Sequence, residues 1–171
     1  MNDTPRLELS DVHKSFGSNV VLSGLNLSHA KGESVVVIGS SGTGKSVLLK
    51  CILGLLRPER GSIRIDGEET VGLGGAERER ILTKFGMLFQ SAALFDSLSV
   101  WENVAFGLIE GAGMAREAAR IIAIDKLAKV GLDADMADGD PAALSGGMRK
   151  RVGLARAIAT DVTSGLAVIG L

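Results

Sequence analysis

The chain has 171 residues, enough for one domain that buries a core without disulfide support. Its 19 basic and 20 acidic residues give a net charge of −1, which argues against a nucleic-acid-binding surface or a basic patch for anionic membranes. The single cysteine, Cys51, excludes an intramolecular disulfide and is typical of a reducing compartment. No stretch approaches the roughly 18 apolar residues of a membrane-spanning helix, and the N-terminus lacks the apolar segment of a signal peptide. We therefore expect a soluble protein that reaches a membrane only through a partner.

The N-terminal part of the chain has the pattern of strands and hairpins. Residues 6–38 alternate short apolar runs with turn residues. The compact β-branched run Ser34–Ile38 predicts a strand that is buried on both faces. A helix is expected over residues 45–56, and strand-like segments follow at 61–69 and 84–90.

From Ser99 onward the pattern becomes helical. Ser99 and Glu102 match a capping box, in which a serine and a glutamate three residues later satisfy the first backbone groups of a helix. Residues 114–132 repeat apolar residues at helical spacing, and a last helix opens at Ser145. Strands therefore surround one helix, and a helical block occupies about residues 99–140. This order predicts an α/β fold with an inserted helical lobe.

One glycine-rich segment predicts nucleotide binding. The sequence GSSGTGKS, residues 39–46, fits the phosphate-loop motif G-x-x-x-x-G-K-[ST] in full, and it lies between the expected strand and helix. Its glycines permit a tight turn, and the amides from Ser41 to Ser46 then point inward at a phosphate chain. Lys45 reaches the β- and γ-phosphates, and the Ser46 hydroxyl ligates Mg²⁺. The motif alone does not separate ATPases, GTPases and small-molecule kinases.

A second motif, LSGGM, narrows the class. In it Ser145 caps a helix, and Gly146 and Gly147 leave the first amides of that helix bare. Together with the phosphate loop, this motif resembles the ATP-binding cassette (ABC) family, whose signature is usually LSGGQ. Met148 replaces the usual glutamine. The resemblance covers nearly the whole chain and implies a P-loop fold with N-terminal antiparallel strands and an inserted helical lobe.

The resemblance also implies further contacts for Mg·ATP. Gln90, at the end of a strand, corresponds to the glutamine that touches Mg²⁺ and the attacking water, and Phe16 corresponds to the aromatic residue on which adenine stacks. In an intact pair of subunits the phosphate loop of one copy faces the signature of the other. The candidate ATP-binding residues are Phe16, Gly39, Ser40, Ser41, Gly42, Thr43, Gly44, Lys45, Ser46, Ser145, Gly146 and Gly147, and the candidate Mg²⁺ ligands are Ser46 and Gln90.

Residues 87–108 look like the branch of the family that drives lipid transport, the Mla (maintenance of lipid asymmetry) ATPases of Gram-negative bacteria. In this segment Phe89, Leu94, Phe95 and Trp101 are candidates for an apolar socket for the membrane subunit, although each would fit a core position equally well. The implied partners are an integral-membrane permease, an MCE-domain lipid-binding protein and a second ATP-binding subunit, as a homodimer, with no nucleic acid. The implied location is the cytoplasmic face of the bacterial inner membrane.

The chain departs from the family after the signature helix. There the family has a buried strand that ends in Asp-Glu, the acids that hold Mg²⁺ and polarise the attacking water. Here Asp161 is the one carboxylate after residue 140, and no Glu follows Glu117. The run TSGL, residues 163–166, resembles the family's DEPTSGLD, or is a chance match of four common residues. We expect a fold that is incomplete at the C-terminus, an aberrant tail over 161–171 in which LAVIGL partly substitutes as a strand, and poor ATP hydrolysis.

Three alternatives stay open at this point. The chain could be a non-catalytic remnant that binds nucleotide or the permease without turnover. It could be an importer ATPase for a solute other than lipid. A different P-loop enzyme, such as a small-molecule kinase, is a third possibility, which LSGGM and Gln90 disfavour.

Overall fold

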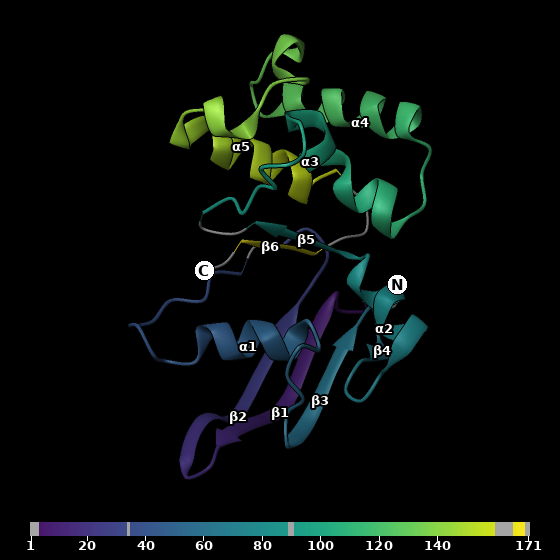
Figure 1. Ribbon diagram of the computed structural model, residues 1–171. Helices are drawn as coiled ribbons and strands as arrows, with labels where there is room; N and C mark the ends of the chain where they lie inside the picture. Colours follow the sequence, from purple (N-terminus) through teal and green to yellow (C-terminus); the bar gives the residue numbers. More distant parts are fainter. Residues whose placement is uncertain (1–3, 34, 89–90, 160–165, 170–171) are drawn as a thin grey trace. The chain divides into compact units, whose positions relative to one another are not determined.

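The computed structural model describes residues 4–33, 35–88, 91–159 and 166–169, with the backbone alone for 166–169. The chain divides into two compact units, Met1–Leu82 and Thr83–Leu171, which we call the sheet unit and the helical unit. Figure 1 shows the elements of both units. Within the described ranges, every helix is too short or too polar to cross a membrane.

The sheet unit is built on a four-stranded antiparallel sheet with the strand order β2-β1-β3-β4. Leu9 and Val12 of β1 and Ile63 of β3 are almost completely buried, as the alternation of apolar residues predicts. Helix α1 lies beside the sheet and packs Leu48 and Ile52 into the core of this unit (Figure 1). The elements of the sheet unit are β1 (Leu7–Phe16), β2 (Asn19–His29), α1 (Lys45–Ile52), β3 (Arg60–Ile65), β4 (Glu68–Glu69) and α2 (Gly75–Leu82).

Two details of the sheet unit differ from the sequence prediction. Helix α1 ends at Ile52 rather than at residue 56, because Gly54 adopts a left-handed conformation (φ 65°) that turns the chain out of the helix. Helix α2 was not predicted. Its one buried residue is Ile81, so it lacks the repeated apolar positions by which a helix is recognised in a sequence.

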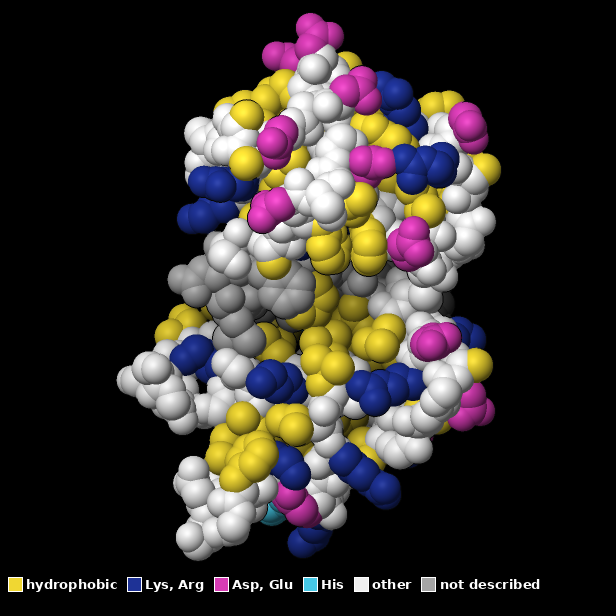
Figure 2. All heavy atoms as spheres, viewed as in Figure 1, with side chains coloured by type: hydrophobic (Ala, Val, Ile, Leu, Met, Phe, Trp, Pro, Cys, Tyr) yellow, Lys and Arg dark blue, Asp and Glu magenta, His cyan; other side chains and the backbone are white. Residues whose placement is uncertain are grey.

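The helical unit combines packed helices with a short parallel sheet. Helices α3, α4 and α5 pack on one another around a core that includes Val104, Leu127 and Val152. Acidic and basic side chains are interspersed over the face of this unit drawn in Figure 2. Its elements are β5 (Phe85–Leu88), α3 (Val100–Phe106), a π-helical turn (Gly107–Gly111), α4 (Arg116–Lys129), two 3₁₀ turns (Ala134–Met136 and Pro141–Ala143), α5 (Gly146–Ala157) and β6 (Leu166–Ile169).

The structure corrects the prediction of a buried strand at Ser34–Ile38. Residues 35–38 follow an irregular course, and the side chains of Val36 and Ile38 are 77% and 89% exposed. A strand needs neighbouring strands for its backbone hydrogen bonds, and none of the strands in the described residues pairs with this segment. Residues 166–169 of the run LAVIGL form a strand, β6, but β6 pairs with β5. The β-branched residues set a preference for a strand, whereas partners elsewhere in the chain decide whether it forms.

A close approach of two backbones fixes β5 against α5. A methyl group added at Gly86 of β5 would lie 1.9 Å from the carbonyl oxygen of Ala157, at the end of α5. This distance is far below van der Waals contact, so β5 and the last turn of α5 can pack in this way only with glycine at position 86.

The turn that leads into α3 is held by a capping box and a buried amide. The backbone N–H and the hydroxyl of Ser99 each donate to the Glu102 carboxylate at 2.8 Å, which confirms the predicted pairing of these residues. Asn103 is fully buried and accepts the Phe95 N–H at 2.7 Å. Its side-chain amide also donates to the carbonyls of Phe95, Leu98 and Ser99. The turn from residue 95 to 99 is therefore shaped by side chains of α3.

Candidate functional site

The phosphate loop turns sharply at two glycines before α1. Gly42 and Gly44 have φ of 84° and 90°, a region that other residues enter only with strain. A side chain at Gly44 would also approach Val21 of β2, to 2.7 Å from its Cγ1. The phosphate-loop motif requires glycine at position 44 and leaves position 42 open, whereas the positive φ favours glycine at both positions. Gly44 also packs the loop against the sheet.

Lys45, the first residue of α1, points back over the loop. Its ammonium donates to the carbonyl oxygens of Gly39 and Ser40 at 2.6 and 2.7 Å. The N-terminus of α1 has no capping side chain and no acidic residue in its first turn, so its first amides keep their partial positive charge. The loop therefore gathers the ammonium and the helix amides around one position, which is the arrangement an anionic phosphate chain needs.

The residues of this loop fit Mg·ATP by their chemistry. The Ser46 hydroxyl is exposed in the first turn of α1, where it is available as an oxygen ligand for Mg²⁺. Ser40, Ser41 and Thr43 are also exposed. In the described residues no group of three or more His, Cys, Asp and Glu side chains could hold a metal ion.

Phe16 lies at the end of β1, in the same unit as the phosphate loop. Its side chain is 49% exposed, so much of the ring is open to a stacking partner. The ammonium of Lys14 lies 5.3 Å from the ring centroid, a cation–π distance. The exposure favours the predicted stacking role over that of an ordinary core phenylalanine.

The signature motif begins α5, as the sequence predicts. The Ser145 hydroxyl accepts the Met148 N–H at 3.3 Å and caps the helix. Leu144 is buried, whereas Ser145, Gly146 and Gly147 are exposed. A methyl group at either glycine would meet no atom within 4 Å. The packing of this chain therefore leaves both positions open to larger residues.

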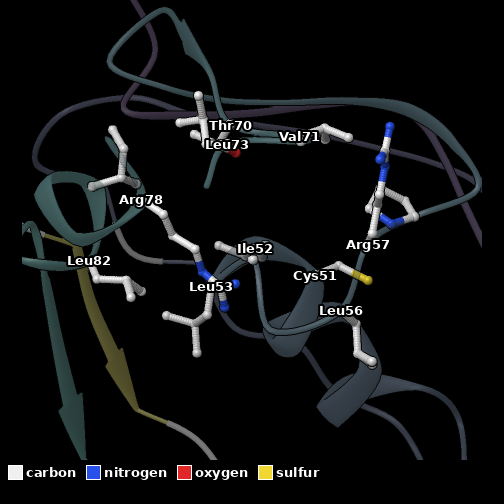
Figure 3. A pocket seen from close by; sticks show the side chains of 14 residues that line it. Cys51, Ile52, Leu53, Leu56, Arg57, Thr70, Val71, Leu73, Arg78 and Leu82 are labelled. Atoms are coloured by element: carbon white, nitrogen blue, oxygen red, sulfur yellow. The ribbon is translucent and has the colours of Figure 1, made fainter. Parts of the chain in front are cut away.

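A separate cavity of about 210 Å³ lies within the sheet unit, between the end of α1, the 70–73 turn and α2 (Figure 3). Most of its lining residues are apolar, and in Figure 3 the Arg78 side chain reaches toward Ile52 and Leu53 at the end of α1. Cys51 also lines it, and burial raises the pKa of its thiol, which is typical of an inert, packed cysteine. No residue of the phosphate loop lines this cavity, so we do not assign the nucleotide to it.

The side chains expected to form an apolar socket have different environments. Phe95 is 42% exposed, and its ring packs at a tilt against that of Phe106, with 4.6 Å between the centroids. Trp101 is buried beneath the guanidinium groups of Arg116 and Arg120, at 5.1 and 5.6 Å. Phe95 therefore remains available for a partner, whereas Trp101 belongs to the core. Phe106 was not predicted as a contact for the membrane subunit, because its exposure at the end of a mostly buried helix is visible only in three dimensions.

Several predicted site residues lie outside the described residues. Gln90 and Phe89 fall in the gap at 89–90, and Asp161 falls in the gap at 160–165. Leu94 is half-buried against the helical core. The structure brings the loop residues 39–46 together around Lys45 and exposes Phe16 and the signature, and it does not test the role of Gln90.

Comparison with known proteins agrees with this geometry. Residues 22–165 match the protein family described as "ABC transporter", a range that includes the phosphate loop and the signature. The chain therefore belongs to the ABC transporter family.

Two curated relatives differ in what their names describe. The chain is 47% identical over 155 residues to the "Probable ribonucleotide transport ATP-binding protein mkl" of Mycobacterium tuberculosis, covering 91% of this chain and 43% of that protein. It is 46% identical over 157 residues to "Protein TRIGALACTOSYLDIACYLGLYCEROL 3, chloroplastic" of Arabidopsis thaliana, covering 92% of this chain and 45% of the relative. The chain thus spans less than half the length of these relatives.

The fold is that of a solved ATP-binding cassette. The dimeric structure of the cassette MJ0796, in a post-hydrolysis state bound to ADP and Pi, matches with a TM-score of 0.79 and 34% sequence identity. The match covers 91% of this chain and 70% of that one. The predicted fold class, an α/β ABC-type ATP-binding fold with N-terminal antiparallel strands, is confirmed.

Proposed function

We propose that the chain is the ATP-binding subunit of an ABC transporter and that it binds Mg·ATP at residues 39–46. The observation that carries this proposal is the position of the Lys45 ammonium, inside a glycine-turned loop at an uncapped helix N-terminus. In this role Lys45 exchanges the carbonyls of Gly39 and Ser40 for phosphate oxygens. The Ser46 hydroxyl would ligate Mg²⁺, which would supply positive charge to offset that of the phosphates.

The remaining candidate residues complete the proposed site. Phe16 offers its exposed ring to adenine, and Gln90 would contact Mg²⁺ and water. We further propose that the two units act as one ATP-binding domain, with about residues 99–140 as its helical lobe. This arrangement follows the family to which the chain belongs.

The signature acts, in this proposal, on the nucleotide of a second copy. The open space around Gly146 and Gly147 supports this role, since nothing in the chain's own packing demands glycine there. Exposed amides at the N-terminus of α5 would face the terminal phosphate held by the other subunit. The MJ0796 cassette is dimeric in its solved structure, which also supports pairing.

Binding of the nucleotide can be measured directly. We expect the chain to bind Mg·ATP in isothermal titration calorimetry and Lys45→Ala to weaken binding at least tenfold, because the variant lacks the ammonium that contacts the phosphates. The matched control is Lys50→Ala, which removes an exposed lysine from the same helix. Equal affinities for the Lys45 variant and the parent would refute the proposed site.

Pairing has its own test. Gly146→Ala should leave the fold intact, since its methyl group meets no atom within 4 Å, and should abolish any ATP-dependent dimer seen by light scattering. Gly111→Ala is the matched control, because it adds a methyl group to equally open space in the same unit. A dimer that survives in the Gly146 variant would contradict the role of the signature.

We propose that these 171 residues hydrolyse ATP slowly. Residues 158–165, which follow α5, contain one carboxylate, Asp161, and no glutamate to polarise water. Loss of such a base costs roughly two to four orders of magnitude in rate. Phosphate release at a rate of order 1 per second or faster, abolished by Lys45→Ala, would overturn this part of the proposal.

The proposed cargo is phospholipid. The resemblance of residues 87–108 to the lipid-transporting branch supports this assignment, and the relative whose name contains a galactolipid supports lipid as the general class of cargo. The proposed partners are a permease that contacts the exposed pair Phe95 and Phe106 and an MCE-domain lipid-binding protein. The proposed location is the cytoplasmic face of the bacterial inner membrane.

The second candidate is an ATPase for the transport of another solute. The name of the mkl relative, which describes ribonucleotide transport, favours this possibility. The genes beside this one distinguish the two candidates. A neighbouring MCE-domain gene supports lipid transport, and a gene for a periplasmic solute-binding protein supports import.

A further inference from the structure

Residues around Phe16 form a connected set of contacts that the proposed ATP site does not yet explain. The Lys14 ammonium lies 5.3 Å from the centroid of the Phe16 ring, and Lys14 also forms an ion pair with Glu59. The Lys14 side chain is only 14% exposed, whereas Phe16 is 49% exposed. A cation therefore contacts the aromatic ring from within the protein while much of the ring stays open.

Glu59 holds this part of β1 through three contacts. Its carboxylate accepts hydrogen bonds from the Lys14 ammonium and, at 2.8 Å, from the Ser15 N–H. Its own backbone N–H donates to the His13 carbonyl at 3.0 Å. The hydrogen bond from Lys14 lowers the pKa of the Glu59 carboxyl, so Glu59 is ionised at neutral pH and can pair with the ammonium.

Glu59 links the end of β1, where Phe16 lies, to the segment that follows the phosphate-loop helix α1. Glu59 lies in the turn between α1 and β3, and α1 begins at Lys45. At its other end, the loop packs Gly44 against Val21 of β2, the strand that is paired with β1. The segment that contains α1 therefore contacts β2 just before the helix, through Gly44, and β1 after the helix, through Glu59.

We infer that Lys14 and Glu59 are positioning residues, which hold the Phe16 ring at a fixed place relative to the phosphate loop so that adenine stacks on its open face. Lys14 occupies space at the ring and restricts its rotamers, and Glu59 fixes Lys14. Aromatic stacking depends on the offset and tilt of the two rings, so a ring that is held in place loses less entropy on binding. This inference rests on the proposed ATP site.

If Lys14 and Glu59 position the ring, they affect the binding of a ligand that carries adenine and not the binding of phosphates alone. Loss of either positioning residue should weaken binding of ATP and leave binding of an inorganic triphosphate chain unchanged, because the phosphate loop itself is not altered. Loss of Lys45 should weaken both. A general loss of folding would also weaken both, so the ratio of the two affinities separates positioning from a merely structural role.

The experiment measures Kd for Mg·ATP and for Mg·tripolyphosphate on the full chain by calorimetry. We expect Lys14→Met and Glu59→Gln each to weaken ATP binding about three- to tenfold and to change tripolyphosphate binding less than twofold. Lys14→Arg should restore most of the ATP affinity, since arginine keeps the cation at the ring. Lys50→Met, which removes an exposed lysine from α1, controls for the loss of one positive charge.

A double-mutant cycle with Phe16→Ala tests the route of the effect. If Lys14 acts through the ring, Lys14→Met should cause less than a twofold change in ATP affinity once Phe16 is alanine. A persistent three- to tenfold loss in that background would overturn the inference, and so would equal losses for ATP and tripolyphosphate. These outcomes leave the proposed ATP site intact, whereas a parent chain that binds neither ligand would overturn both.

Discussion

Arg156, near the end of α5, should be one of the residues on which the stability of the helical unit depends most. Its guanidinium donates to the carbonyl oxygens of Ala92 and Ala93 at 2.6 and 2.8 Å. Both alanines have positive φ, 61° and 45°, which costs strain for a residue with a side chain. Its hydrogen bond to Ala92 is partly buried, and burial lowers the pKa of the Arg156 guanidinium. The contact therefore holds a strained bend in place.

The size of the effect follows from the two hydrogen bonds. A hydrogen bond to a charged group contributes about 1.5–3 kcal/mol, and an unmet buried acceptor costs about the same. Ala92 is fully buried, so its carbonyl would lose its partner outright, whereas Ala93 is exposed and water can replace the arginine there. We therefore expect Arg156→Met, which keeps the length of the side chain, to destabilise the helical unit by about 2–4 kcal/mol.

Urea unfolding followed by tryptophan fluorescence measures this effect. Trp101 is the single tryptophan of the chain and is buried in the core of the helical unit, so its signal reports on that unit. The matched control is Arg151→Met on the same helix, which removes an exposed guanidinium that donates to the Gly131 carbonyl at 2.6 Å. The control should cost less than about 1 kcal/mol.

If Arg156→Met unfolds within about 0.5 kcal/mol of Arg151→Met, a difference typical of neutral surface changes, the buried hydrogen bonds do not hold the bend. Relief of the backbone strain at Ala93 should in turn raise the stability of the helical unit. Ala93→Gly, at an exposed position of positive φ, should stabilise the unit by about 1 kcal/mol. A loss of stability in that variant would contradict the assigned strain.

Three further predictions use the same unfolding assay. Asn103→Leu should cost about 3 kcal/mol or more, because its buried amide serves four backbone groups; a cost below about 1 kcal/mol would refute this role. Hydrogen bonds from Ser99 and from Arg116 lower the pKa of Glu102 from its ordinary value of 4.5. Its contribution to the free energy of unfolding is therefore complete well above pH 4.5 and is lost as the pH falls below that value. Glu102→Gln should therefore lose less stability than the parent between pH 6 and pH 3, and equal losses would argue against this assignment. Gly86→Ala should cost more than about 2 kcal/mol, since its methyl group overlaps the carbonyl of Ala157, and a neutral result would show that β5 packs differently.

The features predicted well from the sequence are those in which the interacting residues are neighbours in the chain. Ser99 with Glu102, and the Ser145 cap, were both expected from spacing alone, and the structure shows them. The glycine turns of residues 39–46 follow from the same local logic. The assignment to the ABC family likewise rested on short motifs, and the family match over residues 22–165 confirms it.

Features that depend on distant parts of the chain were missed or were predicted wrongly. The hydrogen bonds of Arg156 span more than sixty positions, and nothing in the local pattern distinguishes this arginine from Arg151. Trp101 was a candidate for a partner's socket but is buried, because α4 brings two arginines over its ring. Glu59 was not among the predicted functional residues, although its contacts with Lys14 and Ser15 join two segments of the sheet unit.

The run at residues 35–38 marks the division between what the sequence determines and what the tertiary structure decides. The phosphate loop, the signature and the helix caps could be predicted from the sequence alone, because the hydrogen bonds of turns and caps join residues that are only a few positions apart. Residues 35–38 have equally suggestive side chains, but a strand is stabilised by hydrogen bonds to other strands. Only the tertiary structure decided that β5 pairs with β6 and that residues 35–38 lie exposed before the loop.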